Sequence, residues 1–149
     1  MSKPIIAIPI GDPAGIGPEI VAKSLEAEST YNVADCIVVG DKTIMENAIA
    51  ITKTNLKIKT IEGVEDADFT RGVLNLIDLH NIEMSSFRFG QVSGMCGKAA
   101  YEYIEKCIEL ANAGKVDAVS TTPINKESLK AGNIIINSDK VEEAKFFIV

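Results

Sequence analysis

Residues 4–19 read PIIAIPIGDPAGIGPE and decide the fold, because an apolar run leads through a glycine-rich turn into a helix. The run of seven apolar residues has the length of a buried strand. Glycines at positions 11, 15 and 17 permit a tight turn and a close approach to a ligand or to another chain segment. Pro18 suits the first turn of the helix. The stretch therefore predicts the strand, turn and helix that begin an α/β protein.

Asp12 follows this strand directly, at the place where open α/β sheets bind their ligands. Glu19 lies in the first helical turn, beside the positive end of the helix dipole. The glycine spacing, however, differs from the G-x-G-x-x-G pattern of dinucleotide-binding proteins. A tight turn that binds no ligand is therefore the alternative interpretation.

The rest of the chain continues the alternation of strands and helices. Apolar and alternating patterns predict strands at residues 34–39, 56–61, 73–79 and 116–121, and helices at residues 43–50 and 94–113. Such βαβ alternation predicts a mainly parallel sheet with helices on both faces. The strand at residues 56–61 alternates polar and apolar side chains, so we expect it nearer an edge of the sheet.

A second polar turn, TTPINK, follows the strand at residues 116–121. Thr121 and Thr122 offer hydroxyl groups, Asn125 offers an amide and Lys126 offers a cation, which are the groups that a phosphorylated acid would need. The alternative is structural, with Pro123 and Asn125 as turn formers and Lys126 in solvent.

Composition and charge exclude several classes of partner. The net charge is −6 and no basic stripe occurs, which argues against binding to nucleic acid or to an anionic membrane. No apolar run approaches the roughly 18 residues of a membrane span. Cys36, Cys96 and Cys107 form no C-x-x-C pair, and His80 is the only histidine, so we expect reduced, mostly buried thiols and a surface histidine. These features favour a cytoplasmic location.

Three segments together carry a family resemblance: GDPAGIGPE at residues 11–19, VVGDKTIMENA at 38–48 and DAVSTTPINKESL at 117–129. With these three segments in this order, the sequence resembles the 4-hydroxythreonine-4-phosphate dehydrogenases of vitamin B6 (pyridoxine) synthesis. Their relatives oxidise threonate or erythronate 4-phosphate. The resemblance extends from about Ile5 to Gly132. The first segment also resembles isocitrate and isopropylmalate dehydrogenases, which implies a fold like theirs.

The resemblance implies an NAD-dependent oxidoreductase that uses a divalent metal (Zn, Mg, Co or Mn) and works as a cytoplasmic homodimer on a phosphorylated small molecule. The residues that match the family's motifs are candidates for lining the substrate and cofactor cleft. They are Asp12, Gly15, Gly17, Thr121, Thr122, Asn125 and Lys126. Pro123 also matches the family segment. No residue of the chain is assigned as catalytic or as a metal ligand.

The resemblance stops near Gly132, so we divide the chain into an amino-terminal portion of the dehydrogenase fold, residues 1–132, and a divergent tail, residues 133–149. The family's G-H-T-E segment and metal histidines do not occur, and the chain covers less than half of a typical member. We therefore expect the chain alone to be inactive, to bind neither NAD nor metal productively, and to self-associate. The alternative function is a non-catalytic α/β module that binds a phosphorylated metabolite or dimerises.

Overall fold

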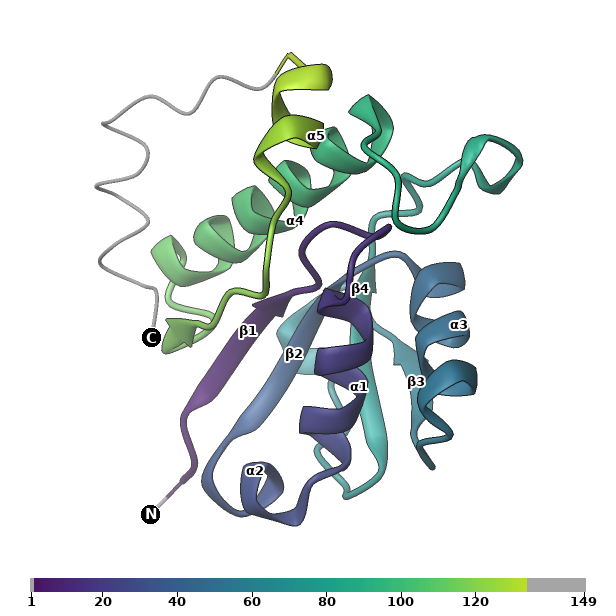
Figure 1. The fold of residues 1–149 in the computed structure, drawn as a ribbon. Helices are drawn as coiled ribbons and strands as arrows, with labels where there is room; N and C mark the ends of the chain where they lie inside the picture. Colours follow the sequence, from purple (N-terminus) through teal and green to yellow (C-terminus); the bar gives the residue numbers. More distant parts are fainter. Residues whose placement is uncertain (1, 134–149) are drawn as a thin grey trace.

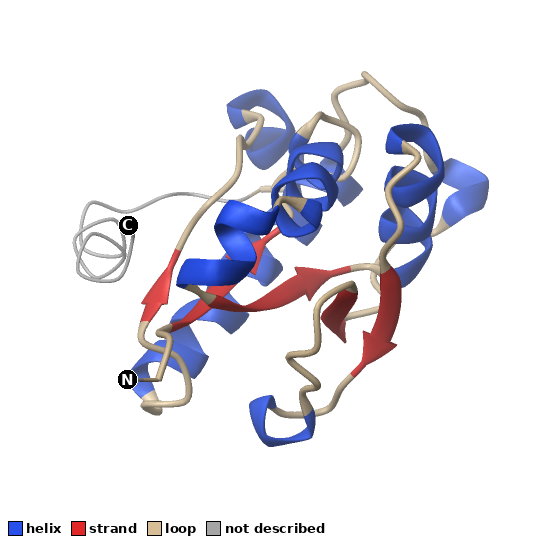
Figure 2. Ribbon diagram, turned by 90° about the horizontal axis from the view of Figure 1, so that it is seen from below, coloured by secondary structure: helices blue, strands red, loops and turns tan. Residues whose placement is uncertain are grey.

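The computed structural model describes residues 2–133 as one parallel sheet with helices on both faces (Figures 1 and 2). The strands are β1 (Ile5–Pro9), β2 (Asp35–Gly40), β3 (Lys57–Thr60), β4 (Val73–Asp78) and β5 (Ala118–Val119). Their order is β3-β4-β2-β1-β5, and every neighbouring pair is parallel. The predicted α/β class and parallel sheet are confirmed, and β3 lies at an edge as expected.

The helices are α1 (Gly17–Glu26), α2 (Glu28–Val33), α3 (Lys42–Thr52), α4 (Gly94–Asn112) and α5 (Lys126–Ala131). Helices α1 and α3 cover one face of the sheet, and α4 covers the other (Figure 1). The sequence did not predict α2 or α5, because each has only six residues and α2 buries none of them. Among the described residues, no helix is both long enough and apolar enough to cross a membrane.

The order of the strands brings the two predicted polar turns together. From β1 the chain passes through α1 to β2, on one side of β1. From β4 it returns through α4, on the opposite face, to β5 on the other side of β1. The sheet therefore reverses its winding between β1 and β5, and open α/β sheets bind ligands beyond the carboxyl ends of strands at such a position.

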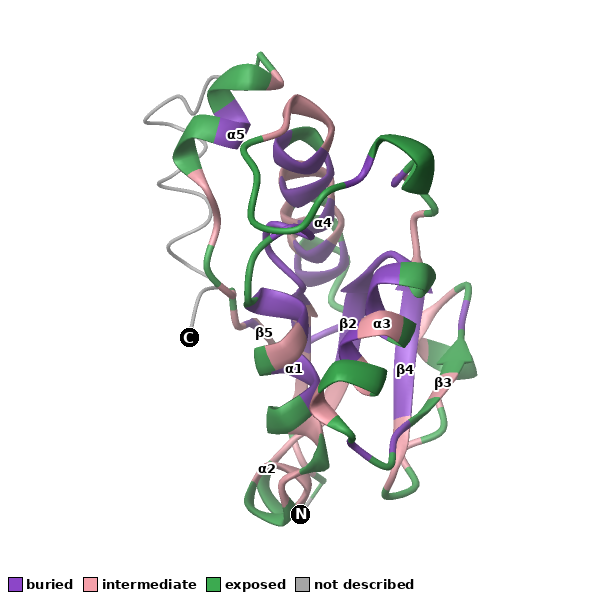
Figure 3. Cartoon of the chain, turned by 45° about the vertical axis from the view of Figure 1, so that its right-hand side comes forward, coloured by how far each residue is buried: buried purple, intermediate pink, exposed green. Residues whose placement is uncertain are grey.

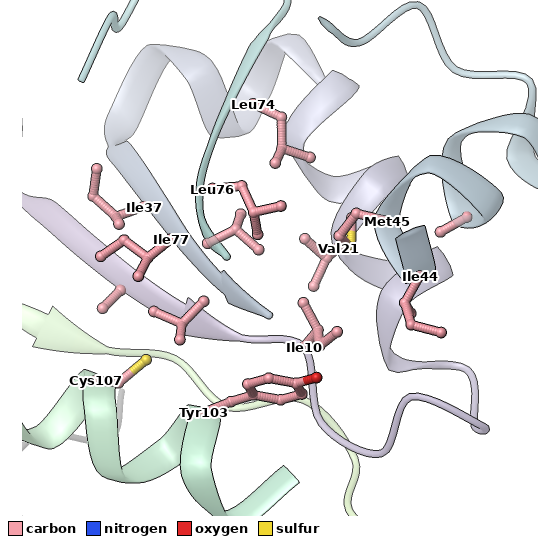
Figure 4. Close-up of a cluster of buried hydrophobic side chains, with 14 of the residues drawn as sticks. Ile10, Val21, Ile37, Ile44, Met45, Leu74, Leu76, Ile77, Tyr103 and Cys107 are labelled. Carbon is pink, nitrogen blue, oxygen red and sulfur yellow. The ribbon is translucent and has the colours of Figure 1, made fainter. Parts of the chain in front are cut away.

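The core lies on both sides of the central strands. Figure 3 shows β2 and β4 as largely buried, and Figure 4 shows Tyr103 and Cys107 of α4 packing from one side. Val21, Ile44 and Met45 of α1 and α3 pack from the other side. The apolar stripe predicted for the long helix is confirmed, with buried side chains at Cys96, Ala100, Tyr103, Cys107 and Leu110.

All three cysteines are free thiols, as predicted, and burial disfavours their thiolate forms. Burial raises the pKa of Cys36 from 9.0 to about 11, with a smaller contribution from the charge of Asp35. Burial also raises the pKa of the Cys96 and Cys107 thiols. These thiols are therefore protonated at neutral pH and pack as small apolar side chains.

The sequence also suggests a strand at Ile134, Ile135 and Ile136 and a short helix carrying Val141, Ala144, Lys145 and Ile148. Both lie outside the described residues, as does nearly all of the divergent tail.

We expect the chain to self-associate in solution. Within residues 2–133, β3 and β5 each pair with a neighbour on one side only, and such strand edges tend to pair with another chain. Exposed apolar side chains, including Val33, Ile51 and Phe89, add to this tendency. Sedimentation velocity over a wide concentration range tests the expectation. A monodisperse monomer with a sharp cooperative melt would contradict it.

Candidate functional site

The turns after β1 and β5 are bonded directly to each other. The backbone N–H of Asp12 donates to the Pro123 carbonyl at 3.3 Å, and the Thr122 hydroxyl donates to the Pro9 carbonyl at 2.9 Å. We call residues 10–16 the glycine turn and residues 120–125 the threonine turn. Together with Lys126, they form what we call the strand-end site.

Two glycines make this contact possible. Gly11 has φ +75°, and a Cβ atom there would overlap the Pro123 carbonyl oxygen and lie 2.5 Å from the Thr122 hydroxyl oxygen. A Cβ atom at Gly17 would overlap the Ile10 carbonyl oxygen and lie 3.0 Å from the same hydroxyl oxygen. The space that these glycines leave is therefore filled by the protein's own chain.

Asp12 shapes the glycine turn from inside. Its side chain is only 4% exposed, and Oδ1 accepts a hydrogen bond from the Ala14 N–H at 2.8 Å. Its carbonyl oxygen accepts one from the Gly15 N–H at 3.0 Å. Burial is the largest cause of the raised pKa of Cys96, and the Asp12 charge contributes to it in the same direction. Asp12 thus directs its carboxylate into its own turn.

The loop before α4 borders the glycine turn. The Gly90 N–H donates to the Ala14 carbonyl at 2.8 Å. Phe89 is 54% exposed and its ring meets that of Phe87 edge-on, with centroids 4.8 Å apart. Ile16 at the tip of the glycine turn is 61% exposed. The site therefore has apolar side chains beside its polar groups.

The threonine turn divides into groups used by the fold and groups open to solvent. Asn125 caps α5, since its Oδ1 accepts from the backbone N–H groups of Glu127 at 2.9 Å and Ser128 at 3.0 Å. Asn125 Oδ1 therefore serves the fold, as the structural alternative predicts. The Thr122 hydroxyl also serves the fold, because its hydrogen bond joins the two turns. Thr121, Lys126 and Gly15 are exposed. Within residues 2–133, Lys126 makes no ion pair.

Helix α5 is held against the start of α4 by two further glycines. A Cβ atom at Gly97 would overlap the Ser128 carbonyl, and one at Gly94 would lie 2.7 Å from the Ala131 carbonyl oxygen. The Ser93 N–H also donates to the Ser128 hydroxyl at 3.2 Å. This contact fixes the position of Lys126. Local sequence patterns do not reveal this contact, although the G-M-C-G spacing places two small residues on one helix face.

A second polar cluster lies where β2 and β4 end. Asp41 caps α3, because its Oδ1 accepts from the Ile44 N–H at 3.2 Å. Its Oδ2 accepts from the Ile82 N–H at 3.3 Å. Asp41, Asp78 and His80 each bring one potential ligand atom within 4.8 Å of the others. From the sequence alone, we expected His80 only as a surface residue.

Comparison with known proteins gives consistent results. The family model described as "Pyridoxal phosphate biosynthetic protein PdxA" matches residues 32–141. A protein of Fusobacterium nucleatum named putative D-threonate 4-phosphate dehydrogenase is 55% identical over 87% of this chain and 39% of its own length. A protein of the same name from Clostridium botulinum is 49% identical over 89% of this chain and 40% of its own length.

A solved structure shows the same fold. A crystal structure of a 4-hydroxythreonine-4-phosphate dehydrogenase from Burkholderia phymatum superposes with a TM-score of 0.89 and 38% identity, over 99% of this chain and 44% of that one. The chain thus spans about 40% of the length of the curated relatives it matches. Because the family model matches well over half of the sequence, this chain belongs to the family of the pyridoxal phosphate biosynthetic protein PdxA.

Proposed function

We propose that this chain provides strand ends that bind the substrate in a dehydrogenase of phosphorylated four-carbon hydroxy acids. The observation that carries the proposal is the direct bonding of the two turns, Asp12 N–H to Pro123 and Thr122 hydroxyl to Pro9. The exposed Thr121 belongs to the turn that this bonding joins to the glycine turn, and the exposed Lys126 follows that turn directly, at the reversal point of the sheet. An enzyme of this family would oxidise its substrate with NAD and a divalent metal.

D-threonate 4-phosphate is the substrate that we favour. The curated relatives with this name are 49% and 55% identical to the chain, whereas the solved 4-hydroxythreonine-4-phosphate dehydrogenase is 38% identical. Erythronate 4-phosphate and 4-hydroxythreonine 4-phosphate, the latter of pyridoxine synthesis, are the competing substrates.

The residues of the strand-end site do not fit a catalytic metal. Its one carboxylate, Asp12, is buried and bonded to the Ala14 N–H, and its other groups are hydroxyls, an amide and an ammonium. They do not fit the pyrophosphate of NAD either, because Thr122 and Pro123 fill the space beside Gly11 and Gly17. We therefore assign this site to the substrate.

Charge supports this assignment. The chain carries a net charge of −6, so an anionic substrate needs a local cation, and Lys126 is exposed at the site. An ammonium group binds phosphate as a point charge, and the Thr121 hydroxyl can donate a further hydrogen bond. Helix α5 holds Lys126 in place through its contact with Gly97.

A titration of the ¹⁵N-labelled chain with D-threonate 4-phosphate, followed by NMR, tests the proposal. We expect saturable shifts in the glycine turn and the threonine turn. Lys126→Ala should weaken binding about tenfold or more, the equivalent of one hydrogen bond to a charged group. Lys130→Ala, which removes another exposed lysine of the same helix, is the matched control. Equal binding by the Lys126→Ala variant, or by D-threonate without phosphate, would refute the proposal.

The chain alone should not reduce NAD with D-threonate 4-phosphate or 4-hydroxythreonine 4-phosphate, whether Mg²⁺, Mn²⁺, Co²⁺ or Zn²⁺ is added. The reason is that the sequence contains a single histidine, whereas the metal is expected to be held by several. An absorbance assay for NADH measures this directly. If turnover exceeds that of a blank without enzyme and persists after the chain is purified again, other residues carry out the chemistry.

A further inference from the structure

Beyond the proposed function, and independently of it, the ends of β2 and β4 place three potential metal ligands together. These neighbouring strands pair with Gly40 opposite Asp78, and the Leu79 N–H donates to the Gly40 carbonyl at 2.9 Å. Asp41 and Asp78 therefore lie side by side at the same edge of the sheet. His80 follows two residues later, and one ligand atom from each of the three lies within 4.8 Å of the others.

Both carboxylates retain acceptor capacity. Asp41 accepts two backbone N–H groups, those of Ile44 and Ile82. Asp78 also accepts two, from Lys42 at 3.1 Å and His80 at 2.9 Å, both on Oδ1. A carboxylate has about four lone-pair positions, so each keeps about two for a further partner.

The same hydrogen bonds hold the ligands in place before any ion arrives. Asp41 is 1% exposed and is fixed by backbone donors from two segments. His80 has φ +47°, and its N–H is bonded to Asp78. Hydrogen bonds of this kind, from groups behind the ligands, orient carboxylates at metal sites. His80 itself is exposed, which gives an ion and its water molecules access.

Two further observations point to an absent partner. No lysine or arginine of residues 2–133 forms an ion pair with Asp41 or Asp78, and the nearby Lys42 ammonium lies 3.9 Å from Glu46 instead. Asn81, next to His80, accepts from the Tyr103 hydroxyl at 2.7 Å, yet its buried Nδ2 has no partner among the described residues. An orphaned buried amide donor commonly marks an ordered water molecule, because a cation cannot accept its hydrogen bond.

We propose that Asp41, Asp78 and His80 bind one divalent transition-metal ion. Two carboxylate oxygens and one imidazole nitrogen suit Zn²⁺, Co²⁺ or Mn²⁺ better than Mg²⁺ or Ca²⁺, which prefer oxygen ligands alone. Water completes the coordination on the open side.

The paramagnetic ion Mn²⁺, added to the ¹⁵N-labelled chain, locates the site without binding strongly to thiols. We expect selective broadening of the amide signals at residues 40–42 and 78–82 at substoichiometric Mn²⁺. Zn²⁺ should compete with Mn²⁺ for the site, whereas Mg²⁺ at the same concentration should not. Broadening centred on the acidic stretch at residues 62–68, or none at all, would overturn the proposal.

Two variants then test the ligands. His80→Gly removes the imidazole and tolerates the positive φ, and Asp78→Asn removes one charge while keeping an acceptor oxygen. Each should weaken Zn²⁺ binding, measured by calorimetry, about tenfold or more. Asp68→Asn, at an exposed acid whose partner is Thr70, is the matched control. A folded His80→Gly variant with unchanged affinity would refute the site. Lys126→Ala should leave metal binding intact, which separates this inference from the proposed function.

Discussion

Alanine in place of Gly17 is expected to destabilise the folded chain by about 1–3 kcal/mol. The added Cβ atom would overlap the Ile10 carbonyl oxygen and lie 3.0 Å from the Thr122 hydroxyl oxygen. Because a backbone atom stands in the way, the glycine turn itself must move, and overpacking of this kind typically costs about 1–3 kcal/mol or more. The better helix propensity of alanine offsets at most about 1 kcal/mol.

Urea denaturation measures this loss as a lower midpoint at an unchanged slope. Gly15→Ala is the matched control, because a Cβ atom there would lie 3.4 Å from the nearest atom, the Asp12 carbonyl oxygen, and its φ is not positive. We expect the control to change stability by less than about 1 kcal/mol. Equal stabilities for the two variants would show that the turns are not packed as described.

Gly97→Ala should be comparably damaging and should also weaken substrate binding. A Cβ atom at Gly97 would overlap the Ser128 carbonyl group and lie 2.6 Å from the Leu129 nitrogen, so α5 would have to move away from α4. We expect a loss of about 1–3 kcal/mol, for the same physical reason. The displacement of α5 would also shift Lys126, so binding of D-threonate 4-phosphate should fall with stability.

Lys98→Ala, one residue further along α4 on its exposed side, is the matched control and should change neither quantity appreciably. Denaturation and the NMR titration together measure both effects. Substrate binding that is unchanged in a destabilised Gly97→Ala chain would mean that α5 does not position the binding group.

The sequence predicted the parallel sheet well because its signals are local. The apolar run at residues 4–10 and the glycines after it determine one strand and one turn, and the long amphipathic pattern of α4 determines which side is buried. The family motifs likewise directed attention to the two turns that the fold brings together. Contacts between distant segments left no such local signal.

The Thr122 hydroxyl bond to Pro9 spans 113 positions, so no pattern within either turn reveals that the hydroxyl serves the fold. The same holds for Gly97, whose partner Ser128 belongs to an unpredicted helix. His80 joins Asp41 only because β2 and β4 are neighbours in the sheet.

A crystal structure of the chain with D-threonate 4-phosphate would show whether the two turns form one binding site for a phosphorylated acid. We expect the phosphate group within hydrogen-bonding distance of Lys126 and Thr121, with the carbon chain beside the glycine turn. A ligand bound elsewhere, or a phosphate group that contacts neither residue, would contradict this expectation.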